Sequence, residues 1–382
     1  MNLLEINNLK IFRSDILTEQ NSIVENITFS VRPGELFGIL GPNGIGKSSI
    51  ANCICGFIPP LRSSKNYFTW GNEQRRMTGE IFKNGVEISN SEPSNRNIGY
   101  VPQNLFLYPH MTVFENITFP LYGKNLKQVE INKIGEKILR EFDLSEIKFA
   151  YPRQISGGQK QKVAVARAII KDPEILVLDE PNANLDPIYK SELLPFIKKF
   201  LRSQNSCAIV ITHDPLEASK YFDKIMIIND KIIHQLDSPN NIYNTPKTPF
   251  VAKFFSNIEN FIEGTYNSDS NLIQSDSLGT IIIEDETNIS TYSRPDIICG
   301  IRSESLKIID LNKNFISGKI IDEFQLSGTN FYRIQINKKN IMVATSRNKR
   351  YKINQDVSLK ITGIRDHDYY FFSNKITHKV SK

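Results

Sequence analysis

Residues 41–48 read Gly-Pro-Asn-Gly-Ile-Gly-Lys-Ser and match the phosphate-binding pattern GxxxxGK[ST]. Glycines let the backbone curl so that successive N–H groups point at phosphate oxygens, and a helix beginning after the loop would offer its positive end. Lys47 would reach the β- and γ-phosphates, and Ser48 would ligate Mg²⁺. The residues predicted to bind the nucleotide here are Gly41, Pro42, Asn43, Gly44, Ile45, Gly46, Lys47, Ser48 and Ser49.

Two neighbouring acids, Asp179 and Glu180, follow the apolar run from Ile175 to Leu178. Asp179 could hold Mg²⁺ directly or through water, and Glu180 could orient and deprotonate an attacking water. Solvated acids are also common at strand ends, which is the competing interpretation. The phosphate-binding loop elsewhere in the chain favours the catalytic one, and the two motifs together predict a nucleotide hydrolase.

A second candidate anion site is the segment Ile155, Ser156, Gly157, Gly158 and Gln159. Its glycines precede a helical pattern, so bare N–H groups at a helix start are expected. One nucleotide does not need two such cradles, whereas the second makes sense if it serves the nucleotide of a partner subunit. The alternative is a flexible Ser-Gly-Gly turn.

Extended through Ala168, the segment that starts at Ile155 resembles the signature of ABC-transporter ATPases, with Ile155 in place of leucine and Lys162 in place of arginine. Further landmarks of that family follow in order over residues 1–255. They are a stacking aromatic for adenine (Phe12, before a longer loop than usual), the Q-loop glutamine (Gln103), the D-loop (Pro181 to Asp186) and the switch histidine (His213).

The resemblance implies that two subunits, most simply a homodimer, close head to tail over two ATP molecules. Glu180 would be the general base, and His213 would contact the γ-phosphate. Ser48, Gln103 and Asp179 would hold Mg²⁺, while Ser156 and Gly158 would reach the ATP of the partner subunit. The other histidines considered, His110, His234 and His378, lack such a position and are interpreted as structural.

Continuous apolar runs place these motifs on a sheet. Leu36 to Leu40, Ile175 to Leu178 and Ala208 to Ile211 are typical of strands buried on both faces of a parallel sheet. Helical patterns lie between them, for example from Val163 to Ile170. The predicted fold class is therefore α/β, a phosphate-loop NTPase cassette with a helical subdomain.

The tail changes character after about residue 258, where short strand-like pieces alternate with turn residues. We expect an ATPase domain over residues 1–240 (helical subdomain about 104–170), a linker over 241–257 and an all-β domain over 258–382. Residues 241–255 and 300–304 resemble importer ATPases for sugars, polyamines and ferric iron. That resemblance implies an OB-like regulatory domain.

Two further segments could meet partners. The aromatic-rich stretch 105–116 resembles the family's groove for a cytoplasmic helix of the membrane subunit, although buried core aromatics are equally expected. Residues 59–79 form a polar insert with the only tryptophan, Trp70, and are interpreted as a variable surface loop rather than a binding segment.

Bulk properties limit the remaining possibilities. The 382 residues carry a net charge of +6, without a run of five like charges, so a solvated surface is favoured over a nucleic-acid partner. Four cysteines without a CxxC pair argue against zinc and suit a reducing compartment. No signal peptide and no apolar run of roughly 18 residues is visible.

The leading prediction is an importer ATPase, peripheral on the cytoplasmic face of the inner membrane. Its expected partners are ABC permease subunits and an extracytoplasmic substrate-binding protein. A soluble ABC ATPase on ribosomes or DNA would usually carry two cassettes, a coiled-coil insert or zinc-binding cysteines. A pseudo-ATPase would lack Lys47, Glu180 or His213. An exporter is disfavoured by the C-terminal domain but stays possible.

Overall fold

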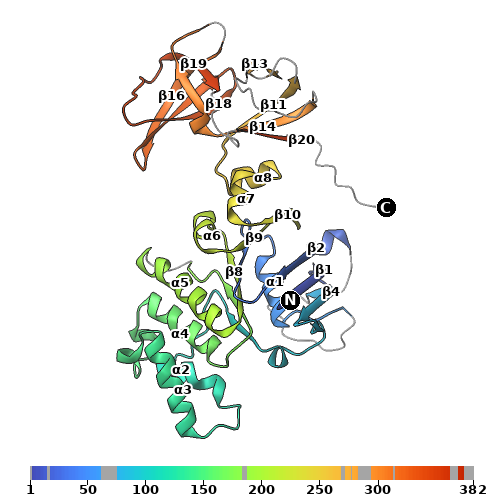
Figure 1. The fold of residues 1–382 in the computed structure, drawn as a ribbon, viewed down its shortest axis with the longest axis vertical. Coiled ribbons are helices and arrows are strands. Elements are labelled where there is room, and N and C mark those ends of the chain that lie inside the picture. Colours follow the sequence, from blue (N-terminus) through green and yellow to red (C-terminus); the bar gives the residue numbers. More distant parts are fainter. Residues whose placement is uncertain are drawn as a thin grey trace. The chain divides into compact units, whose positions relative to one another are not determined.

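The computed structural model describes residues 2–14, 18–61, 75–182, 187–267, 272–276, 278–282, 294–312, 315–361 and 369–373. The chain divides into two compact units, Met1–Pro239 and Asn240–Lys382, which are coloured blue to yellow-green and yellow to red in Figure 1.

A six-stranded sheet forms the centre of the first unit, in the order β10-β9-β3-β8-β7-β6. All its pairings are parallel except that of β10 with β9. Every residue of β3, β7 and β8 is buried, which explains their uninterrupted apolar sequences. The strands are β3 (Leu36–Leu40), β6 (Ile98–Val101), β7 (Ile175–Asp179), β8 (Cys207–Thr212), β9 (Lys224–Asn229) and β10 (Ile232–Asp237). The predicted α/β fold is confirmed.

A four-stranded antiparallel sheet, in the order β2-β1-β4-β5, packs against the first sheet through a shared apolar core. Phe29 of β2 and Phe37 of β3 stack there with ring centroids 4.8 Å apart. The strands are β1 (Leu4–Phe12), β2 (Ser22–Val31), β4 (Arg76–Lys83) and β5 (Val86–Glu87). β4 begins directly after Arg75, the first described residue beyond 62–74. Trp70 and most of the predicted insert lie outside the described residues.

The segment between β6 and β7 is helical, and its helices gather away from β1, β2 and β4 in Figure 1. It contains α2 (Val113–Thr118), η3 (Phe119–Leu121), α3 (Gln128–Glu141), η4 (Ser145–Ile147), η5 (Pro152–Gln154) and α4 (Gly157–Ile169). Thr112 starts α2 with a capping box: its hydroxyl accepts from the Glu115 N–H, and the Glu115 carboxylate accepts from the Thr112 N–H.

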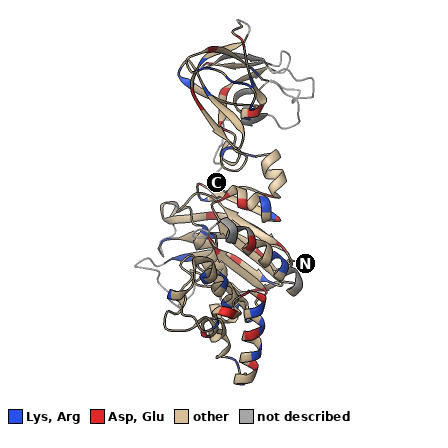
Figure 2. Cartoon of the chain, turned by 90° about the vertical axis from the view of Figure 1, so that its left-hand side faces the viewer, with Lys and Arg blue, Asp and Glu red and all other residues tan. Residues whose placement is uncertain are grey.

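The other helices of this unit connect its strands. They are η1 (Glu19–Asn21), α1 (Lys47–Cys55), η2 (Pro93–Asn95), α5 (Pro187–Gln204) and α6 (Pro215–Tyr221). Basic and acidic residues are interspersed over the described chain (Figure 2), in keeping with the mixed-sign sequence. None of the described helices is both long and apolar enough to span a bilayer.

A buried arginine caps the C-terminal end of α1 by donating hydrogen bonds to its carbonyls. Arg96 is 1% exposed and donates to four backbone carbonyls, those of Cys53 (2.8 Å), Ile54 (2.9 Å), Ser89 (2.9 Å) and Ser91 (3.0 Å). Burial lowers the pKa of its guanidinium. The bonds to Cys53 and Ile54 satisfy carbonyls at the C-terminal end of α1, and those to Ser89 and Ser91 join this end to the segment after β5.

The second unit starts with two short helices and continues as two five-stranded sheets around one core, so the predicted all-β character is confirmed. The helices are α7 (Pro239–Asn244) and α8 (Pro249–Phe254). The first sheet, β13-β12-β11-β14-β20, contains β11 (Asn260–Asn267), β12 (Leu272–Ser275), β13 (Gly279–Ile282), β14 (Arg294–Ile301) and β20 (Tyr369–Ser373). The second, β15-β19-β16-β17-β18, contains β15 (Leu306–Ile309), β16 (Ile316–Leu326), β17 (Thr329–Ile336), β18 (Lys339–Thr345) and β19 (Asp356–Ile361).

The segment expected as a linker, 241–257, belongs to this second unit. Arg302, which follows β14, donates to the carbonyls of Tyr243 (2.8 Å) and Ser256 (3.1 Å), and its guanidinium lies over the Tyr243 ring. These contacts hold α7 and the end of α8 against the all-β core.

Candidate nucleotide site

The predicted phosphate-binding loop runs from the end of β3 to the start of α1, where backbone geometry requires glycine. Gly46 precedes α1 with φ 106°, and a Cβ atom there would lie 2.7 Å from Ile23 Cγ2 and 2.8 Å from Val24 Cγ1, both on β2. A larger residue would therefore clash with the neighbouring sheet and strain the backbone. Glycine therefore allows the left-handed backbone at this position, and the first turn of α1 follows it at the wall of the adjoining cavity.

Lys47 is 5% exposed, and its Nζ donates to the carbonyls of Gly41 and Pro42, both at 2.9 Å. Burial lowers the pKa of this amine, whereas the carboxylates of Glu180 and Asp179 oppose that effect. The ammonium thus rests on the carbonyls of its own loop. Phosphate oxygens would offer it stronger, charged acceptors at the same place.

Asp179, the last residue of β7, is 5% exposed and hydrogen-bonded to the side chain of Ser48. Burial is the largest cause of the raised pKa of its carboxyl group. Its Oδ1 is buried without a hydrogen-bond partner among the described residues. A buried, unpartnered carboxylate oxygen beside a hydroxyl is a set of hard oxygen donors, so these two residues fit a Mg²⁺ ion.

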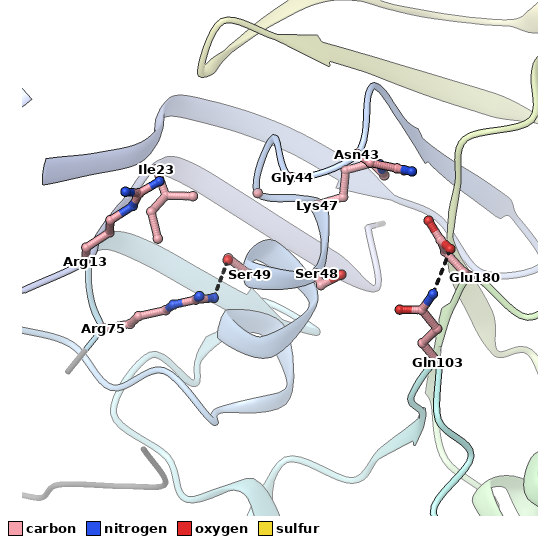
Figure 3. Close-up of a pocket in the computed structure, with 11 residues that line it drawn as sticks. Arg13, Ile23, Asn43, Gly44, Lys47, Ser48, Ser49, Arg75, Gln103 and Glu180 are labelled. Carbon is pink, nitrogen blue, oxygen red and sulfur yellow. Dashed lines mark hydrogen bonds between the residues drawn. The ribbon is translucent and has the colours of Figure 1, made fainter. Parts of the chain in front are cut away.

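Glu180 lies between two side chains from neighbouring strands. Its Oε2 accepts from Gln103 Nε2 at 3.1 Å (Figure 3), and its Oε1 lies 3.2 Å from His213 Nδ1. Gln103 follows β6 and His213 follows β8, so the three groups meet at the carboxyl edge of the parallel sheet. Glu180 has φ 48°, and its N–H donates to the Ile211 carbonyl at 3.0 Å. The sheet therefore holds a left-handed backbone at this residue.

A cavity of about 440 Å³ adjoins this edge and the loop. Eight of the predicted residues line it, namely Asn43, Gly44, Gly46, Lys47, Ser48, Ser49, Gln103 and Glu180. Arg13, Ile23 and Arg75 also line it, and sequence reasoning did not predict them as site residues. They come from the end of β1, from β2 and from the residue before β4, and no local motif marks them.

The structure does not bring every predicted residue into this cavity. Phe12 is only 7% exposed and is absent from the lining, where its neighbour Arg13 stands instead. The segment 155–159 also lies outside the lining; there Ser156 caps α4, accepting from the Gln159 N–H at 3.2 Å. Asp186 lies outside the described residues.

Exposed aromatic side chains mark the helical segment of the first unit. Of the predicted stretch 105–116, Phe106 is 50% exposed. Four more exposed aromatics follow in the same segment, namely Phe119, Tyr122, Phe149 and Tyr151. Exposed aromatic side chains are the residue type that a docking surface for a partner would use.

Known proteins match this chain along most of its length. Residues 24–183 match the family described as ABC transporter. The spermidine/putrescine import ATP-binding protein PotA of Borreliella afzelii is 34% identical over 349 residues, 90% of this chain and 92% of that protein. The Fe(3+) ions import ATP-binding protein FbpC of Fusobacterium nucleatum is 34% identical over 260 residues, 68% of this chain and 66% of its own length.

A solved structure, cbiO1 from Clostridium perfringens, described as part of the ABC transporter complex cbiONQ, aligns with a TM-score of 0.54. The alignment covers 64% of this chain and 91% of that one at 23% identity. At this identity the likeness shows a shared fold.

Proposed function

This chain belongs to the ABC transporter family as the ATP-binding, ATP-hydrolysing subunit of an importer, and from that premise we propose how its residues work. The observation that carries the proposal is Glu180, held between Gln103 and His213 beside the cavity that the phosphate-binding loop lines. A candidate general base and a candidate phosphate-binding loop thus line the same cavity, as nucleotide hydrolysis requires.

ATP binds with its β- and γ-phosphates in the loop of residues 41–48. Lys47 exchanges the carbonyls of Gly41 and Pro42 for phosphate oxygens, while N–H groups of the first turn of α1 donate to the phosphate chain. Ser48 and Asp179, with Gln103, would hold Mg²⁺, which would supply positive charge beside the phosphate oxygens.

Glu180 accepts a proton from the attacking water as the water oxygen bonds to the γ-phosphorus. The bond from that phosphorus to the bridging oxygen breaks, and ADP departs with its electron pair. Gln103 and His213 fix the direction of the carboxylate. Both of its oxygens carry contacts without ATP, so one contact must be released for the water to approach. His213 then turns to the γ-phosphate.

A second copy of the chain completes each site by adding Ser156 and Gly158 across a head-to-tail dimer. The position of residues 155–159 outside the cavity of their own chain supports this arrangement. A helix start with glycines would place N–H donors on the γ-phosphate from the partner side. Closure over ATP and opening after hydrolysis would transmit motion to the membrane subunits.

The membrane partners are permease subunits, docked on the exposed aromatics of the helical segment at the cytoplasmic face of the inner membrane. An extracytoplasmic substrate-binding protein delivers the cargo. Polyamines are the first cargo to test, because PotA aligns over 90% of this chain while the iron importer protein covers 68%. Ferric iron and sugars are the alternatives. We assign the second unit an OB-like regulatory role, and we expect no nucleic-acid partner.

Glu180→Gln and Lys47→Ala test these roles separately. Glu180→Gln should bind ATP, lose more than about 99% of hydrolysis and accumulate as a closed dimer in size-exclusion chromatography with ATP. Lys47→Ala should weaken ATP binding itself in titration calorimetry. Turnover by Glu180→Gln at the wild-type rate would contradict the base assignment, and wild-type ATP affinity in Lys47→Ala would contradict the site.

A further inference from the structure

The nucleotide cavity has two chemically different ends. Figure 3 shows Gln103 and Glu180 on one side of the first turn of α1, and Arg13, Ile23 and Arg75 on the other. Of the charged side chains that line the cavity, Glu180 is the acid, and Lys47, Arg13 and Arg75 are the bases. The end remote from Glu180 therefore carries two guanidinium groups beside one aliphatic side chain.

Arg75 is fixed to the phosphate-binding helix. Its Nη1 donates to Ser49 Oγ at 2.9 Å, and Ser49 is the third residue of α1 and 4% exposed. This contact holds the guanidinium beside the first helical turn, whose residues line the cavity. A planar fork of donors at that place matches the oxygens of a phosphate group.

Arg13 stands where an aromatic was expected. The β1 strand ends with Phe12 buried, and the next residue, Arg13, lines the cavity together with Ile23 of β2. The Arg13 N–H donates to the Asn21 carbonyl at 2.9 Å, which ties the residue to the segment that leads into β2. A guanidinium plane can stack on a purine ring as an aromatic does.

We propose that Arg75 and Arg13 form the base-side wall of the ATP site, with Arg75 bonding the α-phosphate and Arg13 stacking on the adenine. The inference rests on the proposed placement of ATP. With the γ-phosphate at Glu180 and the β-phosphate over the loop, the α-phosphate and base reach the two-arginine end. Arg75 then links the segment before β4 to nucleotide binding.

The test uses Arg75→Met, Arg13→Met and the control Arg32→Met in the full chain, with calorimetric titration of Mg²⁺-free ATP, ADP and inorganic tripolyphosphate. Arg32 is an exposed arginine outside the cavity lining, so its loss reports the general effect of one charge. Arg75→Met should raise the Kd of all three ligands by about tenfold or more. Arg13→Met should weaken ATP and ADP by about tenfold and leave tripolyphosphate unchanged, since that ligand has no base.

The outcomes separate this inference from the proposed function. Wild-type affinities in both arginine variants, with binding still lost in Lys47→Ala, would overturn the two-arginine wall and leave the site in place. Wild-type affinity in Lys47→Ala would overturn the site itself. Should Arg75→Met fail to fold, Arg75→Lys keeps the charge without the fork, and full ADP affinity in that variant would refute bidentate α-phosphate binding.

Discussion

Removing the buried arginine that closes α1 should loosen the helix that carries the phosphate-binding lysine. Arg96→Met keeps the length of the side chain but deletes the donors for the carbonyls of Cys53, Ile54, Ser89 and Ser91. The Cys53 carbonyl keeps the Gly56 N–H at 3.1 Å as a donor, whereas each of the other carbonyls left without a donor costs about 1–3 kcal/mol. Removal of the buried charge offsets part of that sum. We expect a net loss of about 3–5 kcal/mol, a large share of a typical domain stability.

Amide hydrogen exchange across α1 in the full chain measures this loss directly. Since about 1.4 kcal/mol corresponds to a tenfold change, the slowest α1 amides should exchange at least about 100-fold faster in Arg96→Met. Arg140→Met, an exposed arginine on α3, is the matched control and should leave these amides unchanged. Acceleration of less than about fivefold would refute the view that the Arg96 hydrogen bonds hold α1.

Three other perturbations follow from contacts in the first unit. Burial raises the pKa of the Asp179 carboxyl from its ordinary value of 3.8, so the charged form destabilises the fold at neutral pH. Asp179→Asn should therefore raise Tm without Mg²⁺ at pH 7, raise it by less near pH 3.8, and abolish Mg²⁺-dependent ATPase activity. An unchanged or lower Tm at pH 7 would contradict this. Arg167 donates to the carbonyls of Leu105 (2.6 Å) and Phe106 (2.7 Å), and both of these residues have left-handed backbones, with φ angles of 57° and 44°. Arg167→Lys should therefore speed amide exchange at Leu105 and Phe106 and lower kcat, while the Kd of ATP stays unchanged. Amide exchange at the wild-type rate in this variant would refute the view that the Arg167 hydrogen bonds stabilise this segment. Thr112→Ala should destabilise α2 by about 1 kcal/mol in urea unfolding followed by circular dichroism, whereas no change would argue against its capping box.

The parts of the site that are local in sequence could be predicted, and those made by the antiparallel sheet could not. Residues 41–48 carry their own geometry, and parallel strands bring their carboxyl ends together, so the convergence of Gln103, Glu180 and His213 follows from the strand pattern and the family resemblance. Their chemical roles stay predictions. Arg13 and Arg75 approach the cavity from two strand ends that are about sixty residues apart, and only pairing of β1 with β4 brings them together.

The same limit explains two other differences. Phe12 and Arg13 are adjacent, and neither spacing nor composition says which side chain faces the cavity; the burial of Phe12 decides it. The sequence of residues 241–257 predicts a linker because it gives no sign of the contact with Arg302, whose bonds to Tyr243 and Ser256 hold this stretch against the all-β core of the second unit. Long-range hydrogen bonds of this kind leave no periodic signal in the sequence.

The most direct test of the importer assignment is affinity purification of the tagged full chain from its own membranes in mild detergent, followed by mass spectrometry. We expect a polytopic permease and an extracytoplasmic binding protein to co-purify, with ATP hydrolysis that Glu180→Gln abolishes. Recovery of ribosomal proteins or nucleic acid without a permease would contradict the account.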